Sequence, residues 1–445
     1  MATDRGGTGM AESINRREFL PAASAAASAV AWAGIRGTAL RGEDRAPRKS
    51  ANETINLAVI GCGGRGGGAA RDSLNINENV RLVAAADLYG AKCEAMVRAL
   101  AGQYGDRVAV QSDKIFAGLD AYRRVCEDPD VDLVLLTASP GFRPPHLEAA
   151  VQAGKHVFAE KPTCVDPAGY RTCLAAHEAA EKNQTAIVTG TQYRRQTNYV
   201  AAVDQVRAGA IGQIVSATSR YCSSGIWYRK RRAGMSDAEY QLNNWMHFTW
   251  LSGDQICEQA VHNLDVINWV MGAPPVSAYG SGGRFTRPPD SQMWDSFSID
   301  YLYPGDRLLS FMCRQIPGTE SANGSVIRGT EGTLHVAGVS GGSKIFDRSG
   351  KQVWSAAGRI RQAYEQEHKD LVDSIRAGKP IVELRQTADS SLTAVLGRLA
   401  AYTGQRVTWD FVSNQSTLDL FPADLKMDGT LPLDAYAVPG QTELV

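Results

Sequence analysis

The first part of the chain alternates short apolar runs with amphipathic segments. Five runs are rich in β-branched residues or alanine, and turn residues lie at the ends of each. They are 55–60, 80–86, 108–111, 131–137 and 156–159. Helical repeats lie between them, at 68–74, 92–104, 119–127 and 145–153. Strands that alternate with helices are typical of a parallel sheet covered by helices on both faces. This part therefore predicts a doubly wound α/β domain.

The pattern changes after residue 185, where strand-like segments dominate. A short run at 186–190 and a helical stretch at 199–208 come first. Further strands are expected at 214–221, 276–284, 296–303, 307–314, 325–329, 333–337, 343–347 and 351–355. Turn residues separate most of them at hairpin distances, which predicts an α+β domain with a large, mostly antiparallel open sheet.

Three helical repeats, at 261–271, 364–376 and 388–402, would cover one face of this sheet. Its other face would then need a second subunit or extra segments to bury it. We therefore expect a homo-oligomer, either a dimer or a tetramer.

Composition narrows the possible partners. The 445 residues include 47 Lys and Arg and 47 Asp and Glu, and no dense basic block stands out, so nucleic acid is not expected as a partner. Eight cysteines are scattered without a Cys-x-x-Cys pair or zinc-ligand spacing. They indicate neither a disulfide scaffold nor a metal site, and we interpret them as small buried apolar residues.

A glycine-rich turn directly follows the first predicted strand and opens a helix. Its sequence is Gly61-Cys62-Gly63-Gly64-Arg65-Gly66. Gly61 would permit the tight turn, Gly63 the approach of a pyrophosphate, and Gly66 close packing of helix on strand. The helix N-terminus would face the phosphates. This pattern predicts a dinucleotide site.

The next strand ends at Asp87, whose carboxylate would accept hydrogen bonds from the adenosine ribose hydroxyls. A carboxylate repels a 2′-phosphate, so NAD is favoured over NADP, although Arg65 lies in the same loop. The alternative interpretation of Asp87 is a helix N-cap.

The segment 154–162, GKHVFAEKP, resembles the Gfo/Idh/MocA family, which includes glucose-fructose oxidoreductase and inositol dehydrogenase and whose hallmark is a Glu-Lys-Pro turn. Further blocks that match are 130–140 with His146, 189–195 and 253–265. The resemblance implies an NAD-dependent oxidoreductase of sugars or polyols. It also implies a cofactor site that includes Thr137, Pro140, His146, Glu160 and Lys161.

Lys161 follows a central strand, where open α/β sheets bind ligands, and could hold a developing alkoxide. The resemblance implies a cis bond before Pro162. It also implies that His262 removes the hydroxyl proton while hydride leaves for NAD. Glu258 precedes His262 by four residues and could orient it from one helix face, but the family usually has aspartate there, which puts the role of Glu258 in doubt.

A further group of residues are candidate substrate contacts. They are the polar and aromatic residues Tyr193, Arg194, Arg195, Tyr228, Trp245 and Asp265. The aromatic residues are equally well explained as sheet core. The basic run 229–232 could recognise an acidic sugar or be a solvated loop.

The N-terminus carries a further pattern. Asn15-Arg-Arg-Glu-Phe-Leu20 precedes an alanine- and serine-rich run at 21–34 that is too short to span a bilayer. It resembles a twin-arginine signal, which exports folded proteins and would place this one in the periplasm without stable membrane insertion. A disordered tail with a chance arginine pair is the alternative.

These features divide the chain into five parts: a signal at 1–34, a linker at 35–53, a Rossmann NAD-binding domain at 54–180, a substrate and oligomerisation domain at 181–412, and a surface tail at 413–445. Three functions remain open. The chain could oxidise or reduce a carbohydrate with tightly bound NAD, cleave a glycoside by transient oxidation and elimination at the same site, or bind sugar or nucleotide without catalysis.

Overall fold

A computed structural model describes residues 53–339 and 341–445. The expected export signal and all but the last residue of the expected linker lie outside the described residues. None of the described helices is both long enough and apolar enough to cross a membrane.

The first sheet has six strands in the order β3-β2-β1-β4-β5-β6, all of them parallel. The strands are β1 (Ile55–Ile60), β2 (Val80–Asp87), β3 (Ile115–Ala117), β4 (Leu133–Leu136), β5 (His156–Ala159) and β6 (Ile187–Thr189). The strand order reverses between β1 and β4, and ligands bind beyond the carboxyl ends of strands at such a point. The predicted doubly wound α/β domain is confirmed.

Five helices accompany this sheet: α1 (Gly64–Ile76), α2 (Gly90–Tyr104), α3 (Ala121–Glu127), α4 (Arg143–Gln152) and α5 (Pro167–Asn183). The pattern did not predict α5, although Asp166 caps it by accepting a 2.6 Å hydrogen bond from the Gly169 N–H. The strand predicted at 108–111 is wrong. Only Val108 forms a bridge, to Leu82, and the chain turns through short 3-10 helices before β3 takes the sheet edge.

The second sheet has nine strands in the order β14-β13-β12-β11-β7-β10-β9-β8-β15. The strands are β7 (Ile214–Ser223), β8 (Ser277–Gly283), β9 (Ser296–Tyr303), β10 (Arg307–Gln315), β11 (Ala322–Gly329), β12 (Gly332–Val336), β13 (Ser343–Asp347), β14 (Gln352–Ala356) and β15 (Val407–Thr408). All neighbours are antiparallel except β7 and β10, so the expected large, mostly antiparallel sheet is confirmed. A long connection from 224 to 276 separates β7 from β8 and carries Leu242, Trp245, Glu258 and His262 of the candidate site.

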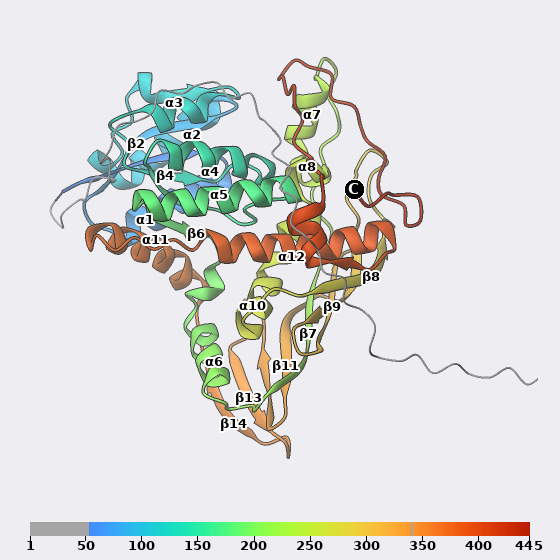
Figure 1. Cartoon of the computed structure of the whole chain (residues 1–445). Helices are drawn as coiled ribbons and strands as arrows, with labels where there is room; N and C mark the ends of the chain where they lie inside the picture. The colour runs from blue at the N-terminus through green and yellow to red at the C-terminus, as the bar shows by residue number, and fades with distance from the viewer. Residues whose placement is uncertain (1–52, 340) are drawn as a thin grey trace, which may run out of the picture. The chain divides into compact units, whose positions relative to one another are not determined.

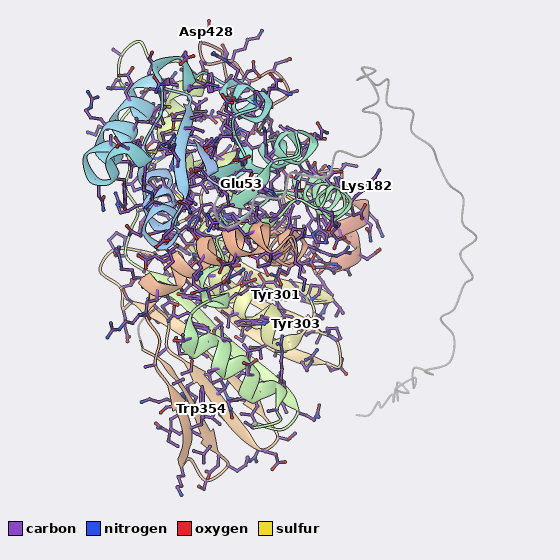
Figure 2. The ribbon with its side chains drawn as sticks, turned by 90° about the vertical axis from the view of Figure 1, so that its left-hand side faces the viewer. Glu53, Lys182, Tyr301, Tyr303, Trp354 and Asp428 are labelled. Atoms are coloured by element: carbon purple, nitrogen blue, oxygen red, sulfur yellow. The ribbon has the colours of Figure 1, made fainter. Side chains whose placement is uncertain are left out.

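Helices α6 (Thr197–Arg207), α10 (Val261–Met271) and α12 (Leu384–Thr403) pack against one face of the second sheet (Figure 1). Nearly all of α12 is buried, and the hydroxyl of Tyr301 reaches the α12 backbone at Gly397. Figure 2 shows Tyr301 and Tyr303 close to α12, with Trp354 toward the distal end of the sheet.

Helix α11 (Ile360–Arg376) does not cover the second sheet, so this part of the expectation is wrong. It packs against α1 and against strands β5 and β6 (Figure 1). Leu371, Val372 and Ile375 belong to the same buried cluster as the strands of the first sheet. The sequence correctly predicted an amphipathic helix here. An amphipathic pattern does not show against which sheet the apolar face of the helix packs.

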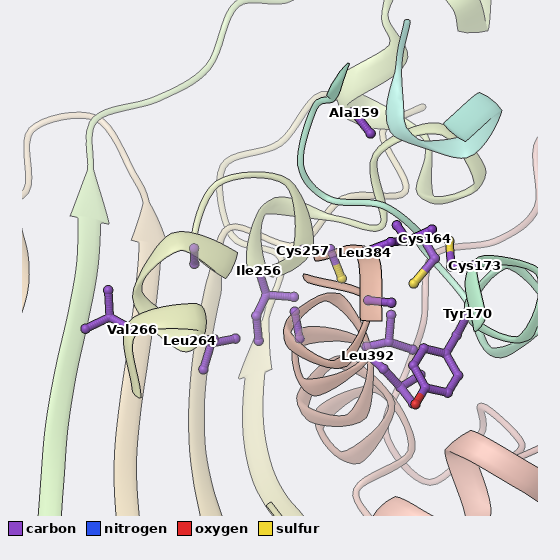
Figure 3. Close-up of a cluster of buried hydrophobic side chains, with 14 of the residues drawn as sticks. Ala159, Cys164, Tyr170, Cys173, Ile256, Cys257, Leu264, Val266, Leu384 and Leu392 are labelled. Carbon is purple, nitrogen blue, oxygen red and sulfur yellow. The ribbon is translucent and has the colours of Figure 1, made fainter. Parts of the chain in front are cut away.

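A second buried cluster joins the two sheets through α12. Figure 3 shows Cys164, Tyr170 and Cys173 on one side of this helix, with Ile256 and Leu264 on the other. All eight cysteines are buried and unpaired, which confirms the interpretation from their spacing.

The chain after residue 416 forms a segment that we name the C-terminal strap, residues 417–437. Its apolar side chains, including Leu420, Phe421 and Leu431, pack on α7 (Asp237–Asn243), α8 (Thr249–Ser252) and Phe142. The Ser236 hydroxyl donates to the Met427 carbonyl at 2.5 Å, and the Gln241 amide donates to the Leu431 carbonyl at 2.9 Å. The strap therefore holds the α7–α8 segment against the turn that follows β4.

Candidate active site

The glycine-rich turn between β1 and α1 has two kinds of glycine. A Cβ on Gly61 would lie 2.4 Å from the Ala138 nitrogen, and a Cβ on Gly66 would lie 2.1 Å from the Gly61 carbonyl oxygen. Gly61 also has a φ of +100°, which favours glycine. Gly63 and Gly64 have no atom within 4 Å of such a Cβ, so they leave open space at the first residues of α1. Close backbone packing below and open space above fit a bound pyrophosphate.

The turn is fixed by neighbouring polar groups. Asp87 accepts a 2.8 Å hydrogen bond from the Cys62 N–H and a 3.1 Å hydrogen bond from the Tyr89 N–H. The Thr137 hydroxyl donates to the Gly61 carbonyl at 2.7 Å. Asp87 is not the N-cap of α2, because that helix begins at Gly90 with Tyr89 in the cap position.

A cavity of about 370 Å³ connects the predicted cofactor residues with Lys161 and Glu258, whereas the third predicted reacting residue, His262, is not among its lining residues. The cavity is lined by Gly61, Gly63, Gly64, Arg65, Asp87, Thr137, Pro140, His146, Glu160, Lys161, Trp245 and Glu258, among others. Gly66 lies beneath the loop rather than at the cavity wall. The carboxylate at one end and the lysine at the other fit the two halves of a dinucleotide.

Lys161 lies at the end of β5, and its bond to Pro162 is cis. The Lys161 ammonium donates to the Glu258 carbonyl at 2.5 Å and lies 3.2 Å from the Glu258 carboxylate. The cavity therefore contains a positive group that two acceptors on α9 (Gln255–Glu258) hold in place.

Glu258 does not orient His262, contrary to the pairing inferred from their spacing. Helix α9 ends at Glu258 and α10 begins at Val261, so the two residues are not on one continuous helix. Glu258 instead pairs with Lys161. The ring of His262 lies 5.6 Å from that of Tyr193, which in turn stacks on Tyr199 at 4.3 Å.

His262 is largely buried next to two cations. Burial, followed by the positive charges of Lys161 and Arg65, lowers its pKa well below the usual range. The imidazole is therefore neutral at pH 7 and can accept a proton.

Arg65 and Glu160 form a charged pair at the floor of the site. The Arg65 guanidinium donates to Glu160, lies 3.6 Å from Asp72 and stacks over the Tyr364 ring at 5.0 Å. Glu367 of α11 is fully buried close to this pair, and burial raises its pKa well above the usual range. Glu367 is therefore protonated and neutral, which explains how its carboxyl group can be buried here without an ionic partner.

His146 on α4 lines the cavity and is held between the rings of Tyr122 and Phe142, at 4.3 and 5.8 Å. Burial lowers its pKa to about 3, so it contributes a neutral ring to the wall. Pro140 begins the short helix that carries Phe142.

Five of the six predicted substrate residues lie outside the cavity lining, and three of these five are held in ion pairs. Arg194 makes a bidentate pair with buried Asp265, at 2.9 and 2.8 Å. Arg195 pairs with Glu383 at 2.8 Å and with Asp370 at 3.2 Å. These guanidinium groups join η4 (Gln192–Arg194) and its neighbour to α10, α11 and α12, so the structure gives them structural partners.

Tyr193, Tyr228 and Trp245 have different positions. Trp245 lines the cavity, Tyr193 is buried beside His262, and Tyr228 is 37% exposed with its hydroxyl 3.0 Å from Asp290. A role in binding substrate stays a prediction for all three.

Several cavity residues were missed from the sequence. Lys92, Tyr122, Arg143 and Leu242 line the cavity. Arg143 donates to the Leu136 and Ala138 carbonyls, at 2.6 and 2.8 Å, and so fixes the turn after β4. Lys92 and Tyr122 lie near the starts of helices that directly follow parallel strands. Ligands bind at that end of such a sheet, so this position in the sequence could have identified both residues. Leu242 comes from the long connection of the second domain, for which no such signal exists. The residues that the structure describes contain no cluster of side chains suited to hold a metal ion.

Comparisons with known proteins agree with this geometry. Residues 55–190 match the profile of an oxidoreductase family with an NAD-binding Rossmann fold, and residues 199–335 match the Gfo/Idh/MocA C-terminal domain. Inositol 2-dehydrogenase of Salmonella typhimurium is 25% identical over 219 residues, which are 49% of this chain and 55% of that enzyme. A glycosyl hydrolase family 109 protein of Shewanella baltica is 24% identical over 246 residues, which are 52% of this chain and 50% of that protein.

Among solved structures, levoglucosan dehydrogenase in complex with NADH and levoglucosan superposes with a TM-score of 0.64. It is 17% identical and covers 80% of this chain and 99% of that chain. The chain spans about half the length of the Salmonella and Shewanella relatives. Levoglucosan dehydrogenase shares the fold over 80% of this chain and 99% of its own. Together, the two profiles, the shared fold and the Glu-Lys-Pro turn show that the chain belongs to the Gfo/Idh/MocA family of oxidoreductases, with an NAD-binding Rossmann fold as its N-terminal domain.

Proposed function

We propose that this protein transfers a hydride between a hydroxyl-bearing carbon of a sugar or polyol and NAD. The observation that carries the proposal is one continuous cavity whose lining includes Asp87, the glycine-rich turn, Lys161 and Glu258. The dehydrogenase names of two relatives support it. When bound, NAD supplies the hydride acceptor.

The residues of the chain would share the remaining chemistry. Lys161 donates a hydrogen bond to the reacting oxygen and stabilises its negative charge as the proton leaves. His262, neutral at pH 7, takes up that proton. Glu258 holds the Lys161 ammonium through its carbonyl and carboxylate, and thereby positions it.

NAD is also expected to stay bound between turnovers. The C-terminal strap packs on the α7–α8 segment and on Phe142, and Leu242, Trp245 and Phe142 all line the cavity. Release of a dinucleotide would require this apolar contact to open. Retention would let the same nucleotide be used repeatedly where free NAD is scarce.

Glycoside cleavage by transient oxidation is the second candidate. The carboxylate of Glu258 supports it, because Glu258 lines the cavity beside Lys161 and could serve there as the additional acid or base that elimination requires. The similarity to a glycosyl hydrolase family 109 protein also supports this candidate.

The deciding experiment is to purify the protein without added nucleotide, denature it and quantify released NAD(H). Free sugars, inositols and aryl glycosides are then tested. Net reduction of added NAD with a free sugar supports the dehydrogenase, and glycoside cleavage without net reduction supports the second candidate. A protein that binds no nucleotide under any condition contradicts both.

A homo-oligomer is proposed from the uncovered face of the second sheet. Leu309 and Phe311 of β10 face the helices and are fully buried, whereas Leu308 of β10 and Tyr279 of β8 are 42% and 54% exposed. A second copy that covers this face would remove them from water. Sedimentation at several concentrations tests this, and a monomer at all of them contradicts it.

Export by the twin-arginine route, to the periplasm, is proposed from the N-terminal sequence alone. Replacing Arg16 and Arg17 with lysine should keep the protein in the cytoplasm. Cell fractionation measures this, and export that is unchanged by the replacement contradicts the proposal.

A further inference from the structure

Aromatic side chains continue the cavity to the molecular surface, and the proposed reaction does not use them. Trp245 lines the cavity, and the Trp227 ring lies 6.3 Å from it. The His247 ring lies 6.1 Å from Trp227 and 5.4 Å from Tyr228. Trp227 and Tyr228 are 38% and 37% exposed. We name Trp227, Tyr228 and Trp245 the aromatic rim.

Hydrogen bonds fix the backbone at Trp227 and the side chain of Tyr228 in the rim. The two ring nitrogens of His247 contact the Trp227 carbonyl at 2.8 Å and the Ser291 hydroxyl at 2.9 Å. The Tyr228 hydroxyl donates to Asp290 at 3.0 Å. Exposed rings fixed in this way lose little conformational freedom when a ligand stacks on them.

The rim is flanked by cations without carboxylate partners. The Arg229 guanidinium lies 4.6 Å from the centre of the Trp227 ring and donates to the Asn243 carbonyl, not to an acid. Within the described part of the chain, Arg229, Lys230 and Arg232 form no salt bridge, whereas Arg231 pairs with Asp237 at 2.5 Å. Arg229 lies at the rim and Lys230 and Arg232 follow it in the chain, while the Asp290 carboxylate that contacts Tyr228 is bound by the hydroxyls of Tyr228 and Tyr240. The excess of positive charge in this segment favours a negatively charged ligand.

We propose that the aromatic rim, with Arg229 and Lys230, binds an anionic sugar unit outside the cavity, adjacent to the unit whose carbon reacts. Exposed aromatic faces suit the C–H surface of a sugar ring, and the cations suit its carboxylate or sulfate. The substrate class is therefore an acidic oligosaccharide or glycoside rather than a free inositol. The identity of the reacting unit rests on the proposed oxidoreductase function, but binding at the rim does not require turnover.

Isothermal titration of the purified protein, with its bound nucleotide, tests binding directly. Three trisaccharides are compared: a trigalacturonate, a sulfated trisaccharide and neutral cellotriose. At least one anionic ligand should bind about tenfold more tightly than cellotriose, and its advantage should shrink as salt screens the charges. The first two ligands distinguish carboxylate from sulfate.

Variants connect the binding to named residues. Trp227→Ala should weaken anionic binding about tenfold, while Trp227→Phe, which keeps a stacking face, should retain most of it. Arg229→Ala combined with Lys230→Ala should remove the preference for the anion. Lys344→Ala, which removes an exposed cation from β13, is the matched control and should bind as the parent does. Measuring bound NAD in each variant confirms that it has folded.

Equal affinity for cellotriose and both anionic ligands would overturn the proposal, as would a single-stranded oligonucleotide that binds the rim as tightly as they do. The proposed reaction can fail separately. If no sugar is oxidised but the rim variants still change binding, the subsite stands and the oxidoreductase proposal falls. If free sugars are oxidised and acidic oligosaccharides do not bind, the reverse holds.

Discussion

At the scale of single residues, the glycines of the cofactor turn give two opposite predictions. Gly66→Ala places a Cβ 2.1 Å from the Gly61 carbonyl oxygen, so it should destabilise the protein and lower its melting temperature. Gly63→Ala meets no protein atom, so it should leave the melting temperature of the nucleotide-free protein unchanged and weaken NAD binding about tenfold or more.

Thermal unfolding and NAD titration of both variants measure these effects. Gly102→Ala in the exposed part of α2 is a control, because its Cβ would also meet nothing within 4 Å, but it lies far from the turn in sequence and outside the cavity lining. Equal loss of NAD affinity in Gly63→Ala and Gly102→Ala would contradict the assignment of the phosphate site.

The pair of Lys161 and His262 predicts a change in pH dependence. Burial and, after it, the charge of Lys161 lower the pKa of His262, so Lys161→Met should raise that pKa in part and move the acid limb of residual activity to higher pH. NMR titration of the histidine measures the same shift without turnover. Lys92→Met, which removes a cation that lines the cavity near Asp87, is the matched control. A His262 pKa that stays the same in both variants would contradict the proposed proximity.

The residues that sequence analysis placed least well are charged ones. Arg194 and Asp265 were both candidates for substrate binding, and the structure joins them to each other. A sequence records that an arginine and an aspartate exist, but not that they approach within 2.8 Å across 71 residues. The glycines and Asp87 were located because their spacing within one strand-turn-helix unit is local.

At the scale of elements, the same distinction explains Glu258 and His262. Their four-residue spacing implied one helix face, which requires an unbroken helix. The helix is interrupted at Gln259 and Ala260, between α9 and α10. The Glu258 side chain contacts Lys161 instead of His262. Most strands were located within one or two residues because alternating burial is visible in sequence, whereas a break between two short helices is not.

The C-terminal strap gives a prediction at this scale. Phe421 contacts the rings of Phe142 and Trp250 at 5.5 and 5.9 Å. Phe421→Ala should lower the free energy of unfolding by about 2 kcal/mol, less than for a fully buried phenylalanine. It should also speed exchange of bound NAD for labelled NAD, because it loosens the strap over the cavity.

Leu433→Ala is the matched control, since this exposed residue of the strap is 48% accessible and is not part of the buried cluster. Stability and the NAD exchange rate are measured on both variants. Faster exchange in the Leu433 variant alone, or no change in either variant, would contradict a retaining role for the strap.

At the scale of the whole molecule, buried histidines predict acid sensitivity. Burial lowers the pKa of His146 and His368 to about 3 and that of His156 to about 4. Unfolded histidines bind protons below about pH 6.5, while these stay neutral in the native state. Stability is therefore fully present above pH 6.5 and is lost as the pH falls toward 4, at about 1.4 kcal/mol per pH unit for each histidine.

His368 permits a specific test, because its ring lies 4.2 Å from that of Phe158 and neither nitrogen has a hydrogen-bond partner. His368→Phe should keep the ring contact and reduce the slope of stability against pH by one proton between pH 6.5 and 4. Urea unfolding at several pH values measures the slope. A slope equal to that of the parent would show that His368 does not titrate on unfolding.

The path of the chain through α11 also has a consequence for biosynthesis. Leu371, Val372 and Ile375 complete the core of the first sheet, yet they are translated more than 180 residues after β6. At about 5–20 residues per second, roughly 10–40 s pass between these events on the ribosome. During that interval the nascent sheet exposes apolar surface that its own chain cannot yet cover, so emerging chains of this protein should be clients of a ribosome-associated chaperone.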